Sequence, residues 1–256
     1  MSTGSRQRVA SVARALALLD EIARSESGLG VNELARRIGV NASTASRLLA
    51  TLQDGGFVER SPDGPYRLGL KLVALSDRVL GQLDVRDRAR PWLTWLVHET
   101  GETATLSVPG GGEAITVDFV PSSSSVVSMA RLGRPSVAHA TAAGKVMLAF
   151  GLPGGPDDRR LAGELVAFTE RTITDRDALA TELDAVRASG VAEAVGEREP
   201  DLNALAAPVI GRGGELVAIL GLQGPAARLP ANTRRTLRAP LRKAAGEVSR
   251  SLGGPG

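Results

Sequence analysis

The sequence predicts an α+β protein with a helical N-terminal domain and a larger domain built on an antiparallel sheet. Near the N-terminus, apolar residues recur every three or four positions and then every two, which predicts helices followed by a β-hairpin. Further along, strand-like runs joined by glycine turns alternate with amphipathic helices, as in domains that combine antiparallel hairpins with flanking helices. The predicted divisions are a first domain at 6–68, a linker helix at 69–84 and a second domain at 85–254.

The composition excludes several classes of protein. Hydrophobic residues make up 43% and charged residues 23% of the 256 residues, as in ordinary globular proteins. There is no Cys, which excludes disulfide scaffolds, iron–sulfur clusters and thiol catalysis, and His98 and His139 are too few for a His-rich metal site. No apolar run could span a membrane, and the polar N-terminus lacks the pattern of a signal peptide. We therefore expect a cytoplasmic protein without metal, cofactor or membrane partner.

The small positive charge lies in the first third of the chain. The net charge is +3, and residues 1–75 hold 10 basic and 7 acidic residues, which leaves 21 of each sign for the rest. A basic N-terminal domain is compatible with nucleic-acid binding. On charge alone, however, chance is the better explanation of so small an excess.

Three helices are predicted in the first domain. The first, at 8–25, carries one apolar stripe, formed by Val9, Val12, Leu16, Leu19 and Ala23. The second follows Gly30, has Leu34, Ala35 and Ile38 on one face, and ends at Gly39. The third has Asn41 as its N-cap and runs through Leu52, before the glycines at 55 and 56. Its buried face is predicted to be Ala45, Leu48, Leu49 and Leu52.

The order helix, helix, helix, hairpin predicts a winged helix-turn-helix. Two short strands flank the turn residues Ser61–Gly64, with Phe57 and Val58 before the turn and Tyr66 and Leu68 after it. Small residues on the polar face of the third helix would let its backbone approach the major groove, where hydroxyls and an arginine contact phosphates or base edges. The alternative is a three-helix packing unit with a solvated polar face. The predicted DNA-binding residues are Asn41, Ser43, Thr44, Ser46 and Arg47 of the helix and Arg60 and Arg67 of the wing.

Helices connect the two domains. The linker helix carries Leu72, Leu75, Val79 and Leu83 on one face. A further helix at 84–100 contains Pro91, which predicts a kink or a restart. Its Trp92 and Trp95 either face a partner subunit or pack against the sheet.

The second domain is predicted to consist of hairpins and helices. Gly110–Gly112 lacks the Lys-Ser/Thr of a phosphate loop and is read as the turn between strands at 103–108 and 114–120. The other predicted elements are a strand at 126–129, helices at 141–150 and 175–189, a hairpin of 204–210 and 215–223, and a closing helix at 232–252.

The sequence contains no recognisable catalytic constellation, and we predict no catalytic residue. No GxSxG, HExxH, GxGxxG or Walker pattern is present. His139 with Thr141 and Lys145 could be drawn as a base with partners, but a structural histidine before a helix is the better interpretation. The acidic residues Glu197, Glu199 and Asp201 are interpreted as a solvated loop.

The start of the 141–150 helix is suited to a small molecule. Its first backbone N–H groups lack intrahelical acceptors, and Ala142, Ala143 and Gly144 carry no bulky side chain. A carboxylate or another acceptor group fits there.

Three stretches resemble one protein family. Residues 11–69, the string HATAAGKVMLA, and residues 168–225 with their GEREP motif resemble, in this order, the IclR family of bacterial transcriptional regulators. The resemblance implies a winged helix-turn-helix that binds a palindromic operator in double-stranded DNA. It also implies a GAF/PAS-like effector domain that senses a small organic molecule, and a homodimer or homotetramer.

The effector site departs from the pattern of the family. Ala204 stands where many members have Cys, Gly221 and Gln223 where they have Ser, and Ala194 near an acidic position. Ser136 stands where an apolar residue is frequent. These replacements would enlarge the cavity and remove polar contacts, so the expected effector is larger and less charged, of aromatic or acyl type. The effector-binding residues so implied are Met129, Ser136, Ala142, Ala143, Ala194, Leu202, Ala204, Gly221 and Gln223.

Two functions from different classes remain at this point. The first is a ligand-responsive DNA-binding regulator, and the second is a metabolic enzyme with an accessory helical domain. An intact helix-turn-helix beside a missing catalytic constellation favours the regulator.

Overall fold

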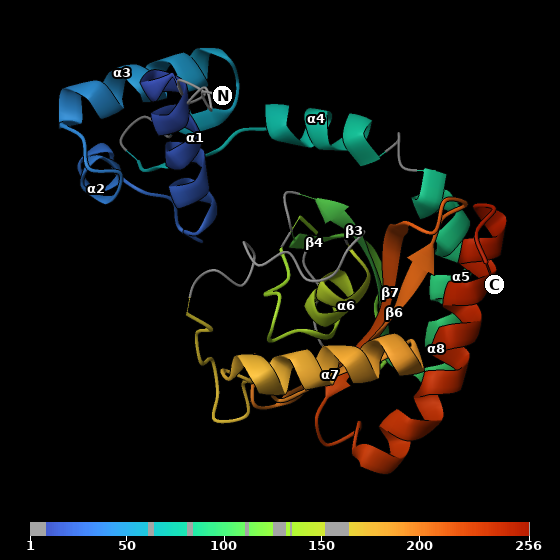
Figure 1. Ribbon diagram of the computed structural model, residues 1–256. Coiled ribbons are helices and arrows are strands. Elements are labelled where there is room, and N and C mark those ends of the chain that lie inside the picture. Colours follow the sequence, from blue (N-terminus) through green and yellow to red (C-terminus); the bar gives the residue numbers. More distant parts are fainter. Residues whose placement is uncertain are drawn as a thin grey trace, which may run out of the picture. The chain divides into compact units, whose positions relative to one another are not determined.

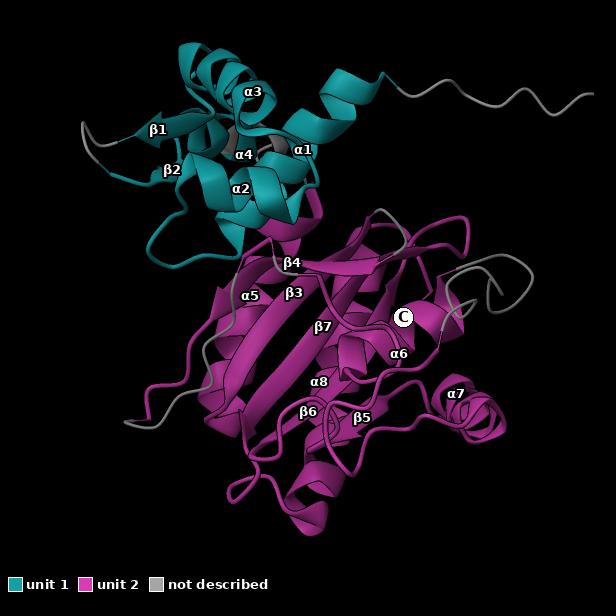
Figure 2. Ribbon diagram, turned by 90° about the vertical axis from the view of Figure 1, so that its left-hand side faces the viewer, with its two compact units in different colours: residues 1–82 teal, residues 83–256 magenta. Residues whose placement is uncertain are grey.

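A computed structural model describes residues 9–60, 64–80, 84–110, 113–124, 132–133, 135–151 and 164–255. The chain divides into two compact units, residues 1–82 and 83–256, which are coloured separately in Figure 2. Within the described residues, no helix is both long enough and apolar enough to cross a membrane.

Unit 1 contains the predicted three helices and hairpin. Its elements are α1 (Ala10–Ala23), α2 (Val31–Arg37), α3 (Ala42–Asp54), β1 (Val58–Arg60), β2 (Tyr66–Leu68) and α4 (Lys71–Leu80). The strands pair antiparallel, with Val58 opposite Leu68. One core cluster joins the helices to the hairpin through Leu18, Ile22, Leu34, Leu49, Val58 and Tyr66. The winged helix-turn-helix is thus confirmed as the fold of this unit.

The turn between α2 and α3 follows the local chemistry expected for it. Gly39 adopts a left-handed conformation with φ of +68°, which a residue without a Cβ adopts at little cost. The Oδ1 of Asn41 accepts a hydrogen bond of 2.8 Å from the backbone N–H of Thr44, so the predicted N-cap is confirmed. Ala45 and Leu49 are fully buried, whereas Leu48 and Leu52 pack at the edge of the core.

The buried face of α1 is not the stripe that the spacing indicated. Val9, Val12 and Leu16 are exposed, and Leu16 keeps 57% of its surface, while Leu18 and Ile22 enter the core. The helix is apolar on two faces, and a spacing of three to four residues does not decide which face is buried. The exposed set therefore forms an uncovered apolar surface on unit 1.

Unit 2 is a five-stranded antiparallel sheet with helices on both faces (Figure 1). Its strands are β3 (Thr103–Gly110), β4 (Glu113–Val120), β5 (Ala192–Val195), β6 (Leu202–Ile210) and β7 (Leu216–Pro225), in the order β4-β3-β7-β6-β5. Its helices are α5 (Asp84–Thr100), α6 (Ala142–Phe150), α7 (Arg176–Ser189) and α8 (Ala231–Ser251). Helices α5 and α8 lie side by side on one face of the sheet, and α6 lies on the other.

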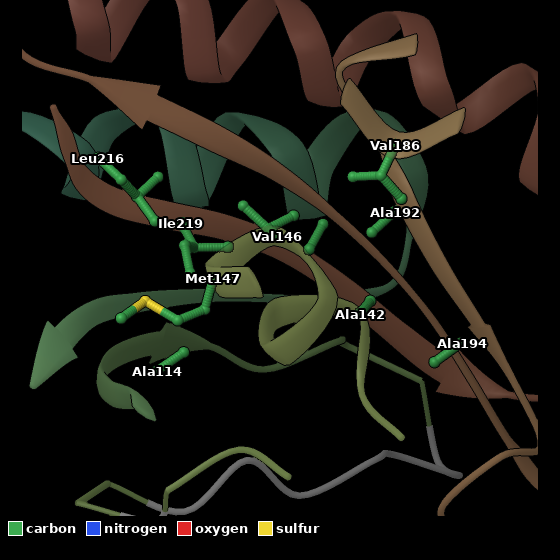
Figure 3. Close-up of a cluster of buried hydrophobic side chains, with 10 residues drawn as sticks. Ala114, Ala142, Val146, Met147, Val186, Ala192, Ala194, Leu216 and Ile219 are labelled. Carbon is green, nitrogen blue, oxygen red and sulfur yellow. The ribbon is translucent and has the colours of Figure 1, made fainter. Parts of the chain in front are cut away.

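The core under α6 also supports the region that forms the candidate site. Val146 and Met147 of α6 pack with Leu216 and Ile219 of β7 (Figure 3). The same cluster contains five buried alanines: Ala114, Ala142, Ala192, Ala194 and Ala206. Three of these alanines, Ala142, Ala194 and Ala206, also line a cavity between α6 and the sheet.

Three features of unit 2 differ from the sequence prediction or lie outside the described residues. Helix α5 continues through Pro91 without restarting. Proline has no N–H to donate to the carbonyl oxygen of Asp87, four residues earlier, and both residues are exposed to water. Strand β5 was not predicted, because four residues are too few to show alternation. The strand expected at 126–129 lies outside the described residues.

The two tryptophans of α5 are half-buried beside α8. The rings of Trp92 and Trp95 meet edge to face, with centroids 5.5 Å apart. The Nζ of Lys243 on α8 lies 5.0 Å from the centroid of Trp95. These ring contacts are with each other and with α8, and they test neither the partner-subunit nor the sheet expectation.

Candidate DNA-binding and effector sites

The polar face of α3 is exposed in unit 1. Ser43, Ser46 and Arg47 are exposed, and Thr44 is half-buried. Among the described residues, no partner contacts the guanidinium of Arg47. Asn41 uses its Oδ1 in the cap and retains its amide N–H groups as donors.

The neighbouring arginines of α2 are held in place. A single carboxylate, that of Glu33, accepts hydrogen bonds from Arg36 at 2.7 and 2.9 Å and from Arg37 at 2.8 Å. The hydrogen bonds from Arg36 and then Arg37 lower the pKa of Glu33 from its ordinary 4.5 to about 2. Within α2 and α3, Arg47 is therefore the arginine that is free to reach another molecule.

The wing contributes two further arginines. The Nε of Arg60 donates to the carbonyl oxygen of Gly64 at 3.3 Å, and its guanidinium lies 5.2 Å from the centroid of the Tyr66 ring. Arg67, on the facing strand, is exposed. The wing therefore presents cationic side chains on both of its strands.

Unit 2 contains a cavity of about 630 Å³ between the start of α6 and the sheet. Its lining includes every described residue that the sequence analysis assigned to the effector: Ser136, Ala142, Ala143, Ala194, Leu202, Ala204, Gly221 and Gln223. The ninth, Met129, lies outside the described residues. Eight positions spread over four segments of the chain thus meet at one cavity.

The start of α6 presents backbone donors to this cavity. Thr141 caps the helix, its Oγ1 accepting a hydrogen bond of 3.0 Å from the N–H of Gly144. The amides of Ala142 and Ala143 have no acceptor among the described residues. A Cβ on Gly144 would collide with the carbonyl oxygens of Val137 and Ala138, so glycine allows that loop to lie against the helix start.

The sheet contributes two rows of side chains to the cavity. In one row, Gln223 lies opposite Ala204, which lies opposite Ala194. In the next row, Gly221 lies between Thr105 and Ala206. These pairings explain why residues from β3, β5, β6 and β7 line one surface.

Three hydroxyl groups in the lining were missed at the sequence level. They belong to Thr105 and Ser107 of β3 and Thr116 of β4. The Ser107 and Thr116 oxygens lie 3.4 Å apart, within hydrogen-bonding distance. Alternation along β3 was a usable signal, because residues 105 and 107 must share a face. The cavity therefore retains more polar groups than the replaced family positions suggested.

The space beside Gly221 is not empty. A Cβ at this position would lie 2.5 Å from the Oγ1 of Thr105, so the threonine side chain occupies the space beside the glycine. Thr105 on the neighbouring strand β3 therefore takes up volume that the lack of a side chain at position 221 was expected to add.

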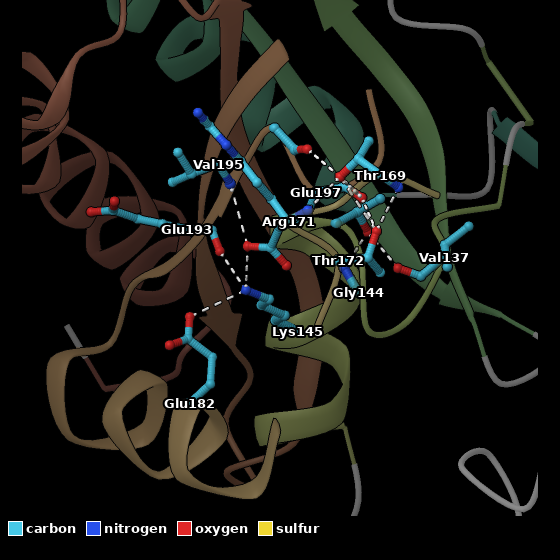
Figure 4. Close-up of polar contacts among 12 residues, drawn as sticks. Val137, Gly144, Lys145, Thr169, Arg171, Thr172, Glu182, Glu193, Val195 and Glu197 are labelled. Carbon is cyan, nitrogen blue, oxygen red and sulfur yellow. Dashed lines mark hydrogen bonds and ion pairs between the residues drawn. The ribbon is translucent and has the colours of Figure 1, made fainter. Parts of the chain in front are cut away.

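The acidic loop is only partly solvated, which corrects another expectation. Glu199 and Asp201 are exposed, but Glu197 is buried. The Nζ of Lys145, itself 1% exposed, donates to Glu197 Oε1 at 2.8 Å, to the Glu193 carbonyl oxygen at 2.9 Å and to Glu182 Oε1 at 3.2 Å (Figure 4). Glu197 also lines the cavity, so this ion pair forms part of its wall.

Glu193 of β5 forms ionic contacts with two arginines of α8. The Glu193 carboxylate accepts hydrogen bonds of 2.8 Å from both Arg234 and Arg238. Burial alone would raise the pKa of Glu193, but the two arginines outweigh burial and lower it.

His139 is structural in its contacts, since its Nε2 lies 2.9 Å from the carbonyl oxygen of Val166.

Comparison with known proteins places both units in one family. Residues 11–62 match the model of the IclR helix-turn-helix domain, and residues 77–250 match that of the bacterial transcriptional regulator IclR C-terminal domain. The chain belongs to the IclR family of bacterial transcriptional regulators. It therefore combines a helix-turn-helix DNA-binding domain with a domain that binds a small-molecule effector.

Individual IclR-family members match this chain over nearly its whole length. The HTH-type transcriptional regulator XynR of Escherichia coli is 33% identical over 249 residues, which cover 96% of this chain and 98% of XynR. An IclR transcriptional regulator from a Silicibacter species has a TM-score of 0.82 at 30% identity, covering 95% and 96% of the two chains. An IclR homolog from Microbacterium hydrocarbonoxydans, complexed with 4-hydroxybenzoate, has a TM-score of 0.78 at 25% identity, covering 94% and 98%. These relatives favour the regulator over the metabolic enzyme.

Proposed function

We propose that α3 enters the major groove of operator DNA and that the wing contacts the adjacent backbone. Ser43, Ser46 and Arg47 would contact base edges or phosphates, with Asn41 and Thr44 at the helix start, and Arg60 and Arg67 would approach phosphates from the wing. The observation that carries this assignment is the contrast between Arg47, which has no partner among the described residues, and the arginines of α2, which Glu33 holds.

The same proposal includes a homo-oligomer on a palindromic site. One recognition helix reads only a few base pairs, so two copies are needed for a selective operator. Apolar side chains on α1 and at the start of α4 support a second copy as partner, because water otherwise surrounds Val12, Leu16 and Val73. We propose a dimer or a dimer of dimers, acting in the bacterial cytoplasm where the DNA lies.

For the effector, we propose an aromatic or acyl-chain carboxylate. The N–H groups of Ala142 and Ala143 would bind the carboxylate at the positive end of α6. Ala194 and Ala204 leave room for carbon, and each Å² of apolar surface removed from water contributes roughly 25 cal/mol. The 4-hydroxybenzoate bound by the Microbacterium homolog supports an aromatic ligand for a cavity of this fold.

A gel-shift titration tests this function with the whole protein. The probe is the DNA upstream of the gene itself, at two salt concentrations, with benzoate, hexanoate, glyoxylate or pyruvate added. We expect binding that weakens with salt and that changes with benzoate or hexanoate but not with the short acids. Binding that ignores the DNA sequence would contradict operator recognition, and a response to pyruvate alone would contradict the proposed ligand class.

A further inference from the structure

Thr105 lines the cavity of unit 2, and no other described residue forms a hydrogen bond with its hydroxyl group. Its side chain is half-buried, and within the described residues its Oγ1 has no hydrogen-bond partner. The neighbouring hydroxyls are engaged differently, since Ser107 and Thr116 pair with one another and Thr141 caps α6. A half-buried hydroxyl left without a protein partner requires water or a ligand.

The position of this hydroxyl is tied to a glycine on the next strand. Thr105 and Gly221 are direct partners in the β3–β7 pairing. A Cβ on Gly221 would lie 2.5 Å from Thr105 Oγ1, so a side chain at position 221 would overlap the threonine hydroxyl in the rotamer that it adopts here. The cavity thus holds one polar group at this point, and β3 supplies it.

We propose that Thr105 is a specificity-determining residue that binds a hydroxyl group of the effector. This inference rests on the proposed function of the cavity, in which the amides of Ala142 and Ala143 hold the carboxylate. A threonine hydroxyl both donates and accepts, which matches a ligand hydroxyl better than a second carboxylate. The ligand class is therefore a hydroxylated aromatic acid rather than a purely apolar one.

Calorimetric titration of the full chain with benzoate, 3-hydroxybenzoate and 4-hydroxybenzoate tests the assignment. We expect the wild type to bind at least one hydroxylated isomer about three- to tenfold more tightly than benzoate, the effect of one neutral hydrogen bond. Thr105→Val keeps the shape and removes the hydroxyl, so the ratio between the affinities for the hydroxylated acid and for benzoate should fall to about one. Thr105→Ser should retain the preference.

Thr116→Val is the matched control. It removes a hydroxyl from the same cavity, but one that already lies within hydrogen-bonding distance of Ser107, so the preference for the hydroxylated acid should survive. Loss of the preference in Thr116→Val, or its survival in Thr105→Val, overturns the role of Thr105 while aromatic binding stands. If the wild type binds none of the three acids, the aromatic ligand class and the role of Thr105 are both wrong.

Discussion

Lys145 and Glu197 form an ion pair of 2.8 Å between side chains that are 1% and 8% exposed. The pair joins α6 to the loop before β6, and the same ammonium reaches α7 through Glu182. Since α6 presents backbone amides to the cavity of unit 2 and Glu197 lines its wall, the pair fixes two sides of the cavity relative to one another.

Removing one charge of this pair should destabilise unit 2 strongly. Lys145→Met leaves Glu197 buried without its cation, and loss of one partner of a buried pair costs about 3–5 kcal/mol. Urea unfolding followed by tryptophan fluorescence reports unit 2 selectively, because both tryptophans lie in α5. The double variant Lys145→Met/Glu197→Leu should recover part of the loss, whereas strictly additive losses would show that the two charges do not depend on each other.

Arg47→Ala should weaken operator binding without affecting the fold. A base contact is worth roughly 1–3 kcal/mol, while an exposed side chain without partners contributes under about 0.5 kcal/mol to stability. Fluorescence anisotropy with labelled operator measures the first quantity and thermal unfolding the second. Arg36→Ala, which removes a guanidinium held by Glu33, is the control and should bind DNA more nearly as the wild type does. A lowered melting temperature with unchanged affinity in Arg47→Ala would refute the assignment.

Gly221→Ser should destabilise unit 2 because of Thr105. The added Cβ overlaps the threonine hydroxyl, and overpacking of this kind costs about 1–3 kcal/mol. Removing that hydroxyl with Thr105→Ala should rescue Gly221→Ser, so the two changes together should cost less than their sum. Urea midpoints of the four proteins measure the coupling, and zero coupling would mean that the two positions are independent.

Glu33 makes the stability of unit 1 depend on pH in the acid range. Its pKa in the folded protein is about 2, below its ordinary 4.5, so the unfolded chain binds the proton more readily. This contribution is fully present above about pH 4.5 and decreases as the pH falls towards 2. Thermal unfolding by circular dichroism from pH 5.5 to 2.5 should therefore be less pH-dependent for Glu33→Gln than for the wild type. Parallel curves for the two proteins would contradict this.

Leu16→Glu should dissociate the proposed oligomer. A carboxylate in the apolar surface of α1 would be buried by a second copy, yet the isolated fold should tolerate it because Leu16 is exposed. Sedimentation velocity measures the mass, and footprinting of the wild type should show two half-sites one or two helical turns apart. Ser11→Glu, on the same exposed helix, adds the same charge outside the apolar set and is the control. An unchanged mass for Leu16→Glu would place the interface elsewhere.

Local chemistry made much of this fold predictable, and long-range pairing accounts for what was missed. Helix α3 needed only its apolar spacing and the cap at Asn41. The cavity positions were predicted from the resemblance to the IclR family, whose members share the tertiary arrangement that brings them together. By contrast, the role of Thr105 depends on its strand partner Gly221, and the burial of Glu197 depends on Lys145. Such partners lie far apart in sequence, so spacing alone cannot reveal them.

The order of strands in unit 2 also has a consequence for how the protein is made. The β3–β7 pairing joins residue 103 to residue 223, so the centre of the sheet cannot close until residue 223 has left the ribosome. The contacts of unit 1 are complete by residue 82, and this unit can fold while the rest is being synthesised. Until β7 arrives, β3 has an unpaired edge, and such edges favour aggregation. Newly made protein therefore exposes this edge from the emergence of the β3–β4 hairpin until that of β7.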